Sequence, residues 1–551
     1  DVVYHASNYV HRTTDGGMTW ETLSGDLTTD QEWQQELPGG PLQHDHTGVE
    51  VYNTIFALAE SPLTAGEIWV GSDDGLVHIS RDDGASWTEI TPRAMPEGGT
   101  VNMIEPSSHR PGRAYMAVYR YREDDWRPYI FRTDDWGGSW RLLTDGRNGI
   151  PDDHPARVVR EDPEREGLLY AGTEFGLFVS FDDGRRWQSF RQNLPVTPIT
   201  DLAVHRGDLV VATQGRSFWI LDDLSPVREM RAAIETALDN GGMHLFQPRP
   251  AYQLNLRGFG GDRAPDRAPA GAIVHFGLSE AMAEADGLRL EIRNAAGDPV
   301  RVFATEPDSV SDPEPGAIWT GDVEDLDAEP GINRFVWDLQ APGPDIIEGS
   351  IMSLGYTGGM WAQPGRYTIR LTAGDDVHER TLELRADPRV ELDPDALEER
   401  FRLTLAIRDE ITAVHDAIGR IRSVREQATG IADRIGEIER VDAAVSGAVR
   451  ARADSLADRL TEIEEALIQT RNEAGQDPLN FPPKLDNQLV YLYGHVNAAY
   501  GRPTAGSYER WDDLQAEAAP HLDGLAELLE TGVPAFNSLL REHGIGGVVV
   551  P

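Results

Sequence analysis

The chain has 551 residues and a formal net charge of −43, from 93 acidic and 50 basic residues. This length predicts two to four domains. The acidic charge and the absence of a basic stripe argue against nucleic acid as a binding partner, because its phosphates would be repelled. The absence of cysteine excludes a disulfide framework, a thiolate metal site and thiol chemistry. No apolar run reaches the roughly 20 residues needed to span a membrane.

The basic residues are almost all arginine, since Lys484 is the single lysine. An acidic, arginine-rich and lysine-poor composition is typical of halophilic proteins, whose surface charges are screened by salt. A second interpretation stays open, in which the acidic surface recruits cations or basic partners.

An octapeptide of the form Ser/Thr-x-Asp-x-Gly-x-x-Trp occurs four times, at residues 13–20, 80–87, 133–140 and 180–187. Each copy lies between strand-like runs, which indicates a hairpin turn. Glycine supplies backbone freedom, aspartate bonds nearby backbone N–H groups, and tryptophan packs the turn onto the sheet. Eight residues are therefore assigned a structural role: Asp15, Trp20, Asp82, Trp87, Asp135, Trp140, Asp182 and Trp187.

The spacing of the runs predicts repeated units of four strands, A to D from the centre outward. Complete units are expected at residues 54–92, 101–143 and 156–191. Residues 2–23 supply strands B, C and D of a first unit. Residues 199–223 supply A, B and C of a fifth, whose D strand we place at residues 243–247 after a helix at 226–238.

The octapeptide resembles the Asp-box, or bacterial neuraminidase repeat, of the β-propellers found in sialidases, xyloglucanases and sortilin. Residues 54–62 and 215–223 resemble large bacterial proteins of the sortilin-like or glycosyl-hydrolase-like kind. The resemblance implies a β-propeller over residues 1–247 and a secreted, periplasmic or cell-surface location, although no signal peptide is visible. Such propellers usually have six or more blades, so we expect the remaining blades from an upstream segment or another chain.

Residues 248–390 differ in composition and strand pattern from the repeated units before them. A Gly/Pro-rich stretch at 258–271 precedes alternating runs at 272–276, 288–292, 333–337, 367–371 and 380–384. These runs predict a small antiparallel β-sandwich, and they resemble the immunoglobulin-like modules of secreted bacterial proteins. The Gly-rich insert at residues 342–362 is expected to lie against a neighbouring element.

Residues 391–551 have a helical period. Asp393-Pro394 reads as an N-cap followed by proline at the first helical position. A first helix is expected to carry apolar residues from Leu397 to Ile421, and a second those from Ile431 to Leu467. Two more, at about 485–499 and 508–529, complete a predicted antiparallel helical bundle.

The face opposite the boxes is the predicted site, because the B–C loops and D–A connections meet there. Long loops over a rigid scaffold favour function. Five residues of the B–C loops are ligand-binding candidates: Asp73, Asp74, Tyr121, Gln214 and Arg216. For Arg216 two roles stay open, an ion pair with Glu174 or a bidentate bond to a ligand.

The candidates for catalysis are carboxylates. Asp45 or Glu50, from the long connection at residues 28–53, could act with Glu174 as acid and base on a glycosidic bond. His44, Asp45 and His46 could bind a divalent metal, but a His-x-His is common in solvated loops and the sequence indicates no further ligand, so we expect no metal and no cofactor.

The sequence therefore predicts a propeller that binds carbohydrate and, as a glycoside hydrolase, could cleave it. Neither the sialidase Phe/Tyr-Arg-Ile-Pro segment nor the two xyloglucanase aspartates can be matched, so catalysis stays open. The alternative is a non-catalytic, sortilin-like scaffold that binds protein or peptide.

Overall fold

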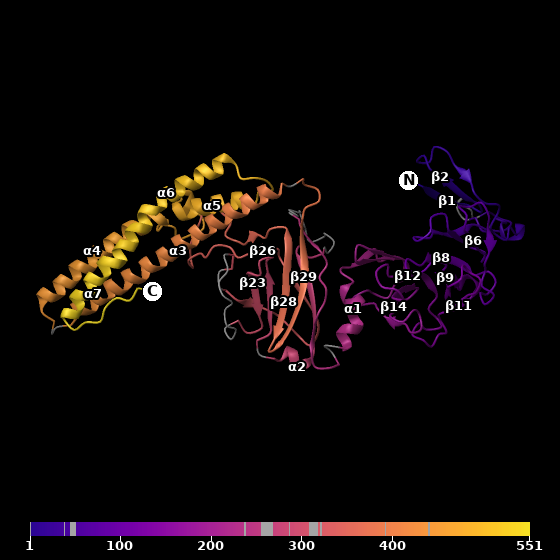
Figure 1. Ribbon diagram of the computed structural model, residues 1–551, viewed down its shortest axis with the longest axis horizontal. Coiled ribbons are helices and arrows are strands. Elements are labelled where there is room, and N and C mark those ends of the chain that lie inside the picture. Colours follow the sequence, from indigo (N-terminus) through magenta and orange to yellow (C-terminus); the bar gives the residue numbers. More distant parts are fainter. Residues whose placement is uncertain are drawn as a thin grey trace. The chain divides into compact units, whose positions relative to one another are not determined.

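The computed structural model describes residues 2–37, 39–44, 51–235, 239–254, 268–285, 287–307, 318–319, 322–391, 393–438 and 441–550. The chain divides into two compact units, residues 1–230 and residues 231–551. In Figure 1 the strands β1 to β14 belong to the first unit, and the long helices α3 to α7 belong to the second.

Five antiparallel sheets follow one another in unit 1. Their strands are β1 to β3 (Val3–Ala6, Val10–Thr13, Glu21–Thr22), β4 to β7 (Ile55–Glu60, Ile68–Ser72, Val77–Ser80, Thr88–Glu89), β8 to β11 (Thr100–Pro106, Ala114–Arg120, Asp125–Thr133, Arg141–Leu142), β12 to β15 (Ala156–Glu161, Leu169–Thr173, Gly176–Ser180, Gln188–Ser189) and β16 to β18 (Ile199–His205, Asp208–Thr213, Phe218–Leu221). The predicted four-stranded units are thereby confirmed.

The first strands of successive sheets lie side by side. β4 contacts β8, β8 contacts β12, and β12 contacts β16. A separate apolar cluster fills the space between each pair of neighbouring sheets. This arrangement is consistent with consecutive blades of a β-propeller.

The predicted fourth strand of the fifth sheet is wrong. β19 (Met243–Leu245) pairs with β21 (Ala272–Leu278) of unit 2 instead. The predicted helix before it exists as α1 (Ser225–Ala233). Alternation alone placed this strand, and an apolar triplet cannot by itself specify which sheet edge it joins.

Unit 2 begins with two larger sheets and a two-stranded antiparallel sheet. One sheet has the order β19-β21-β25, and the other has the order β20-β29-β28-β22-β23-β24. The remaining strands are β20 (Ala251–Gln253), β22 (Arg289–Arg293), β23 (Pro299–Ala304), β24 (Glu324–Asp325), β25 (Gly331–Trp337), β26 (Gln340–Ala341), β27 (Met360–Trp361), β28 (Gly365–Ala373) and β29 (Asp376–Ala386). The larger sheet is not purely antiparallel, because β20 and β24 join its edges in parallel.

The helices follow the last strand. They are α3 (Pro394–Gly436), α4 (Ala443–Leu467), α5 (Leu485–Asn497), α6 (Ala505–Glu527) and α7 (Val533–Glu542), with short helices at Glu32–Gln34, Tyr121–Glu123, Glu280–Ala283, Asp477–Leu479 and Leu528–Gly532. The predicted cap is present, since the Asp393 side chain accepts from the Asp395 N–H. Ile431 and Ile435 lie on α3 rather than on a second helix. No helix in the described ranges is long and apolar enough to cross a membrane.

The Gly-rich insert lies along α5, as expected for a segment packed on a neighbour. Asn487 exchanges two hydrogen bonds of 2.8 Å with the backbone of Ser353. The Tyr493 hydroxyl donates to the Gly358 carbonyl at 2.9 Å. These polar contacts attach the β-rich part of unit 2 to its helices.

Candidate functional site

The four boxes lie on one face of unit 1, together with the turns between strands A and B. In three sheets a residue of the box donates its backbone N–H to the carbonyl of the glycine in that turn. The pairs are Asp83 to Gly66 at 3.0 Å, Trp136 to Gly112 at 2.9 Å and Asp183 to Gly167 at 2.9 Å. The boxes are thus the outer turns of the sheets, as their sequence predicted.

Each box aspartate closes its own turn. Asp15 accepts from the backbone N–H of Thr19 at 3.0 Å and from its hydroxyl at 2.7 Å. These bonds, the backbone one first, lower the pKa of Asp15 to about 2. Asp82 and Asp135 make the same pair of bonds with Ser86 and Ser139, which lowers the pKa of both carboxyls.

Three of the four box tryptophans connect neighbouring sheets. The indole Nε1 atoms of Trp87, Trp140 and Trp187 donate to the backbone carbonyls of Leu23, Ile90 and Leu143, each in the preceding sheet. Bonds that close turns and join sheets account for these residues without a ligand.

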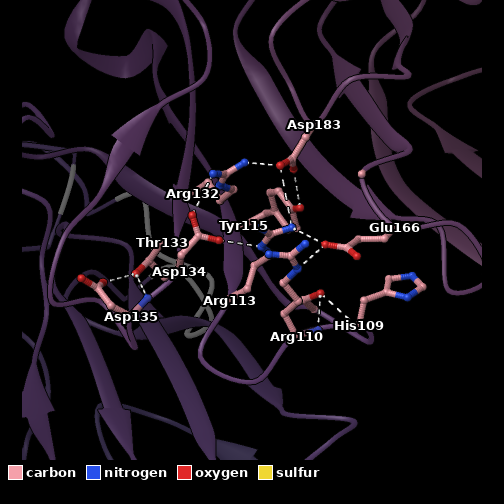
Figure 2. A network of polar contacts seen from close by, with 12 residues as sticks. His109, Arg110, Arg113, Tyr115, Arg132, Thr133, Asp134, Asp135, Glu166 and Asp183 are labelled. Carbon is pink, nitrogen blue, oxygen red and sulfur yellow. Dashed lines mark hydrogen bonds and ion pairs between the residues drawn. The ribbon is translucent and has the colours of Figure 1, made fainter.

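An ion-pair network joins the third and fourth sheets on this face (Figure 2). Arg113 is buried and lies 2.6 Å from Asp134, 3.2 Å from Glu166 and 3.7 Å from Asp183. The Tyr115 hydroxyl donates to Asp183 at 2.8 Å, and burial raises the pKa of this hydroxyl. Because each charge is compensated by a protein partner, we assign the network to sheet cohesion.

The opposite face is built by the B–C loops, and three of these loops bond the residue just before strand A. The backbone N–H groups of Asp73, Glu174 and Gln214 donate to the carbonyls of Thr54, Pro155 and Pro198 at 2.9, 3.1 and 2.9 Å. These three loops are therefore attached at the same level of their sheets.

Asp73 and Asp74 are both buried, and each accepts hydrogen bonds from neighbouring protein groups. Asp74 accepts from the Thr29 N–H at 2.7 Å and from the Asn53 amide at 2.6 Å. Asp73 accepts from the Thr54 N–H at 2.9 Å, and burial raises its pKa. The two carboxylates anchor the long connection that precedes β4.

Aromatic rings and arginines gather around the B–C loop of the third sheet. Tyr121 stacks on Tyr119 with centroids 4.9 Å apart, and Trp126 lies 6.2 Å from Tyr121. Arg157 of β12 lies over both tyrosine rings, at 5.6 and 5.7 Å, and pairs with Glu174 at 2.5 Å. We call these five residues the aromatic–arginine cluster.

The sequence pointed to only part of this cluster. Tyr121 and Glu174 were candidates, whereas Tyr119, Trp126 and Arg157 were missed. The alternation Tyr119-Arg120-Tyr121 could have indicated two rings near one strand end. No local pattern identifies Arg157, because it comes from the neighbouring sheet.

Of the two roles left open for Arg216, the ion pair with Glu174 is wrong, since Glu174 pairs with Arg157. Arg216 and Gln214 are exposed in the loop of the fifth sheet. The loop is held by its backbone, where the Arg216 N–H donates to the Thr213 hydroxyl at 3.1 Å.

The catalytic candidates Asp45 and Glu50 lie outside the described residues, as does His46. Among the described residues, no group of three or more His, Asp or Glu side chains is placed to hold a metal ion. The pairing of Asp45 or Glu50 with Glu174 stays a prediction.

Comparison with known proteins gives three relatives, and no family model matches the chain. The chain is 26% identical over 192 residues to an oligoxyloglucan-reducing end-specific xyloglucanase of Emericella nidulans, covering 29% of this chain and 22% of that protein. It is 25% identical over 333 residues to a xyloglucanase of Paenibacillus sp, covering 56% and 29%. It is 32% identical over 141 residues to vacuolar protein sorting/targeting protein 10 of Laccaria bicolor, covering 24% and 8%.

The resemblance to xyloglucanases and to a sorting protein, inferred from the boxes, is confirmed at this coarse level. The chain spans less than a third of the length of each of these relatives.

Proposed function

We propose that unit 1 is part of an Asp-box β-propeller that binds carbohydrate at the aromatic–arginine cluster. The observation that carries this proposal is the stacked, partly exposed set of rings on the face opposite the boxes. Sugar rings present C–H groups that pack on aromatic faces, and their hydroxyls take hydrogen bonds from guanidinium groups. The xyloglucanase relatives support the same class of ligand.

Binding has more support than hydrolysis. Glu174 is held by Arg157, and Asp73 and Asp74 accept several hydrogen bonds each. Carboxylate oxygens that already accept hydrogen bonds from protein donors are not free to contact a glycosidic oxygen. Catalysis would therefore depend on Asp45 or Glu50, with Glu174 as the second carboxylate.

The chain is proposed to act outside the cell or in the envelope, with the rest of the propeller supplied by an upstream segment or another chain. Residues 248–390 would be an immunoglobulin-like sandwich and residues 391–551 a helical bundle. The alternative function is a peptide-binding scaffold, which the sorting-protein relative supports.

The binding test uses the full chain on a glycan array that includes xyloglucan oligosaccharides, followed by titration calorimetry. Trp126→Ala and Tyr121→Ala are expected to weaken binding at least about 10-fold, equivalent to about 1.4 kcal/mol. Trp20→Ala is the matched control, because Trp20 is 47% exposed on the box face and Trp126 is 44% exposed on the cluster face.

An array on which no glycan binds, or equal weakening by Trp20→Ala, would contradict the proposal and favour the peptide-binding alternative. Hydrolysis is tested separately by release of reducing ends. If Glu174→Gln releases them as fast as the parent chain, Glu174 has no catalytic role.

A further inference from the structure

One aliphatic residue joins each of the last three boxes to the sheet before it. This residue directly follows the outer strand of the preceding sheet, and its carbonyl accepts the box indole. Its side chain also covers the box glycine, where an added Cβ would meet it within 3 Å. The three sets are Leu23 with Trp87 and Gly84 (2.9 Å), Ile90 with Trp140 and Gly137 (2.6 Å), and Leu143 with Trp187 and Gly184 (2.7 Å).

The first box lacks this contact within the described part of the chain. Trp20 is 47% exposed, whereas Trp187 is 3% exposed. Among the residues that the structure describes, a Cβ on Gly17 would meet only the ring of Trp20 itself, at 3.9 Å, and Met18 is 82% exposed.

The strand beside the first box is uncovered on the same side. Strand register identifies equivalent residues, because Val3, Ile68, Ala114 and Leu169 each pair with the first residue of a box. Ile68, Ala114 and Leu169 are 0% exposed and belong to apolar clusters shared with the preceding sheet. Val3 is 49% exposed.

The position two residues further along repeats this contrast. His5 is exposed. The equivalent residues in the next three sheets, Val70, Met116 and Ala171, are at most 1% exposed. Three internal junctions thus show what covers this surface when it is occupied.

We propose that the surface formed by Val3, His5, Gly17, Met18 and Trp20, here called the open box surface, docks another four-stranded sheet of this same repeat. The partner sheet must present a leucine or isoleucine directly after its outer strand. This inference rests on the propeller proposal, and it specifies the partner and the contacts.

A second copy of this chain fits less well than a further sheet. The end of unit 1 away from the first box is the fifth sheet, which among the described residues ends at β18 and has no outer strand. It therefore offers no residue equivalent to Leu23, Ile90 or Leu143. The relatives supply the length that a further sheet needs, since the chain covers 22% and 29% of the two xyloglucanases.

The test adds a copy of residues 51–113 directly before Val3 in the full chain. Val3 is equivalent to Ala114, which pairs with Pro106 of β8. The copied β8 can then pair with β1 in native register. The carbonyl of the copied Ile90 can accept a hydrogen bond from the Trp20 indole, and its side chain can cover Gly17.

We expect Trp20 to contribute to the stability of unit 1 only in the extended chain. There, Trp20→Ser should lower the Tm of unit 1 by at least about 3 °C, whereas in the parent chain the exposed ring should change it by less than about 1 °C. Ile90→Asp in the added copy, with the native Ile90 intact, should cause the same loss.

A second readout does not depend on melting. With 5-fluorotryptophan, the Trp20 fluorine resonance is assigned by its absence in Trp20→Phe, and it should lose solvent exposure in the extended chain. Equal effects of Trp20→Ser in both chains, an exposed Trp20 resonance, or an extended chain whose added sheet does not fold would each overturn the proposal. The glycan test is independent, because it concerns the opposite face.

Discussion

The two units of the molecule build their apolar cores in different ways. In unit 1 the described residues form separate clusters, each between two neighbouring sheets. In unit 2 a single cluster runs from Met243 in β19 to Val548 after the last helix, and includes residues of both sheets and of α3 to α7. Unit 1 can therefore be divided at its junctions, whereas the sheets and helices of unit 2 depend on one another.

This difference predicts different unfolding behaviour. A repeated array with nearest-neighbour contacts loses cooperativity when one junction is weakened. A continuous core transmits the loss of one side chain to every element that shares it. Substitutions in the two units can test each half of this statement.

The largest effect is expected for Trp337→Ala in unit 2. Trp337 is 1% exposed, and its indole donates to the Gln340 carbonyl at 2.9 Å. Removing such a side chain costs about 3–5 kcal/mol. Strand and helix signals of unit 2 should melt together at a lower temperature in circular dichroism, with unit 1 unchanged. Helices that keep the parent Tm would show that the core is not shared.

The pH dependence of unit 2 should combine two opposing buried groups. Burial raises the pKa of Asp486 to about 6, so its contribution to stability is present below about pH 4 and is lost as the pH rises to about 6. Burial, and secondarily Arg422, lowers the pKa of His415 to about 4, so its contribution is present above about pH 6.5 and is lost as the pH falls.

These slopes oppose each other between about pH 4 and pH 6.5. Asp486→Asn should remove one of them and leave unit 2 less stable at pH 4.5 than at pH 7, by up to about 2–3 kcal/mol. Urea unfolding at both values measures this, and His415→Asn should give the opposite slope. Parallel pH curves for the two variants would contradict the assignment.

A smaller loss is expected for Arg113→Ala in unit 1. Arg113 is 6% exposed, but its partners Asp134, Glu166 and Asp183 are 27–48% exposed. We therefore expect about 2 kcal/mol, less than for a fully buried pair. The loss should shrink in about 1 M NaCl, where partly exposed charges are screened. Arg127→Ala, a pair with a 60% exposed arginine, is the control that should change stability little.

The sequence predicted features that depend on residues close together in the chain, but it did not predict the contacts between sheets. Alternating runs and boxes located the strands from β1 to β18, because pleat and turn chemistry act over a few residues. They did not place Met243–Leu245, whose partner β21 is chosen by tertiary packing. In the site, Tyr121 could be found from its loop, whereas Arg157 could not, because its contacts with Tyr119, Tyr121 and Glu174 cross between sheets.

A more local effect is expected for Asp182→Ala in the fourth box. The carboxylate accepts from the Arg186 N–H at 2.9 Å and from the Ser180 hydroxyl at 3.0 Å. Loss of these bonds should cost about 1 kcal/mol and lower the Tm of unit 1 without changing glycan binding. Asp153→Ala, at a carboxylate that is 80% exposed, is the control. An unchanged Tm for Asp182→Ala would contradict the structural role of the box.

The smallest effect on stability is expected for Arg216→Ala. Its side chain is exposed, and Glu174, one of the two partners considered for it, forms an ion pair with Arg157 instead. Removing an exposed side chain outside any network changes stability by less than about 0.5 kcal/mol.

Arg157→Ala should behave differently, because it leaves Glu174 unpaired and removes the cation over two rings. We therefore expect Arg157→Ala to lower both the Tm of unit 1 and glycan affinity, and Arg216→Ala to leave the Tm unchanged. If Arg216→Ala also leaves affinity unchanged while Arg216→Lys does the same, the ligand surface ends before the fifth sheet. Weaker binding by both variants at constant Tm would instead extend the surface to that loop, with the guanidinium fork as the recognised feature.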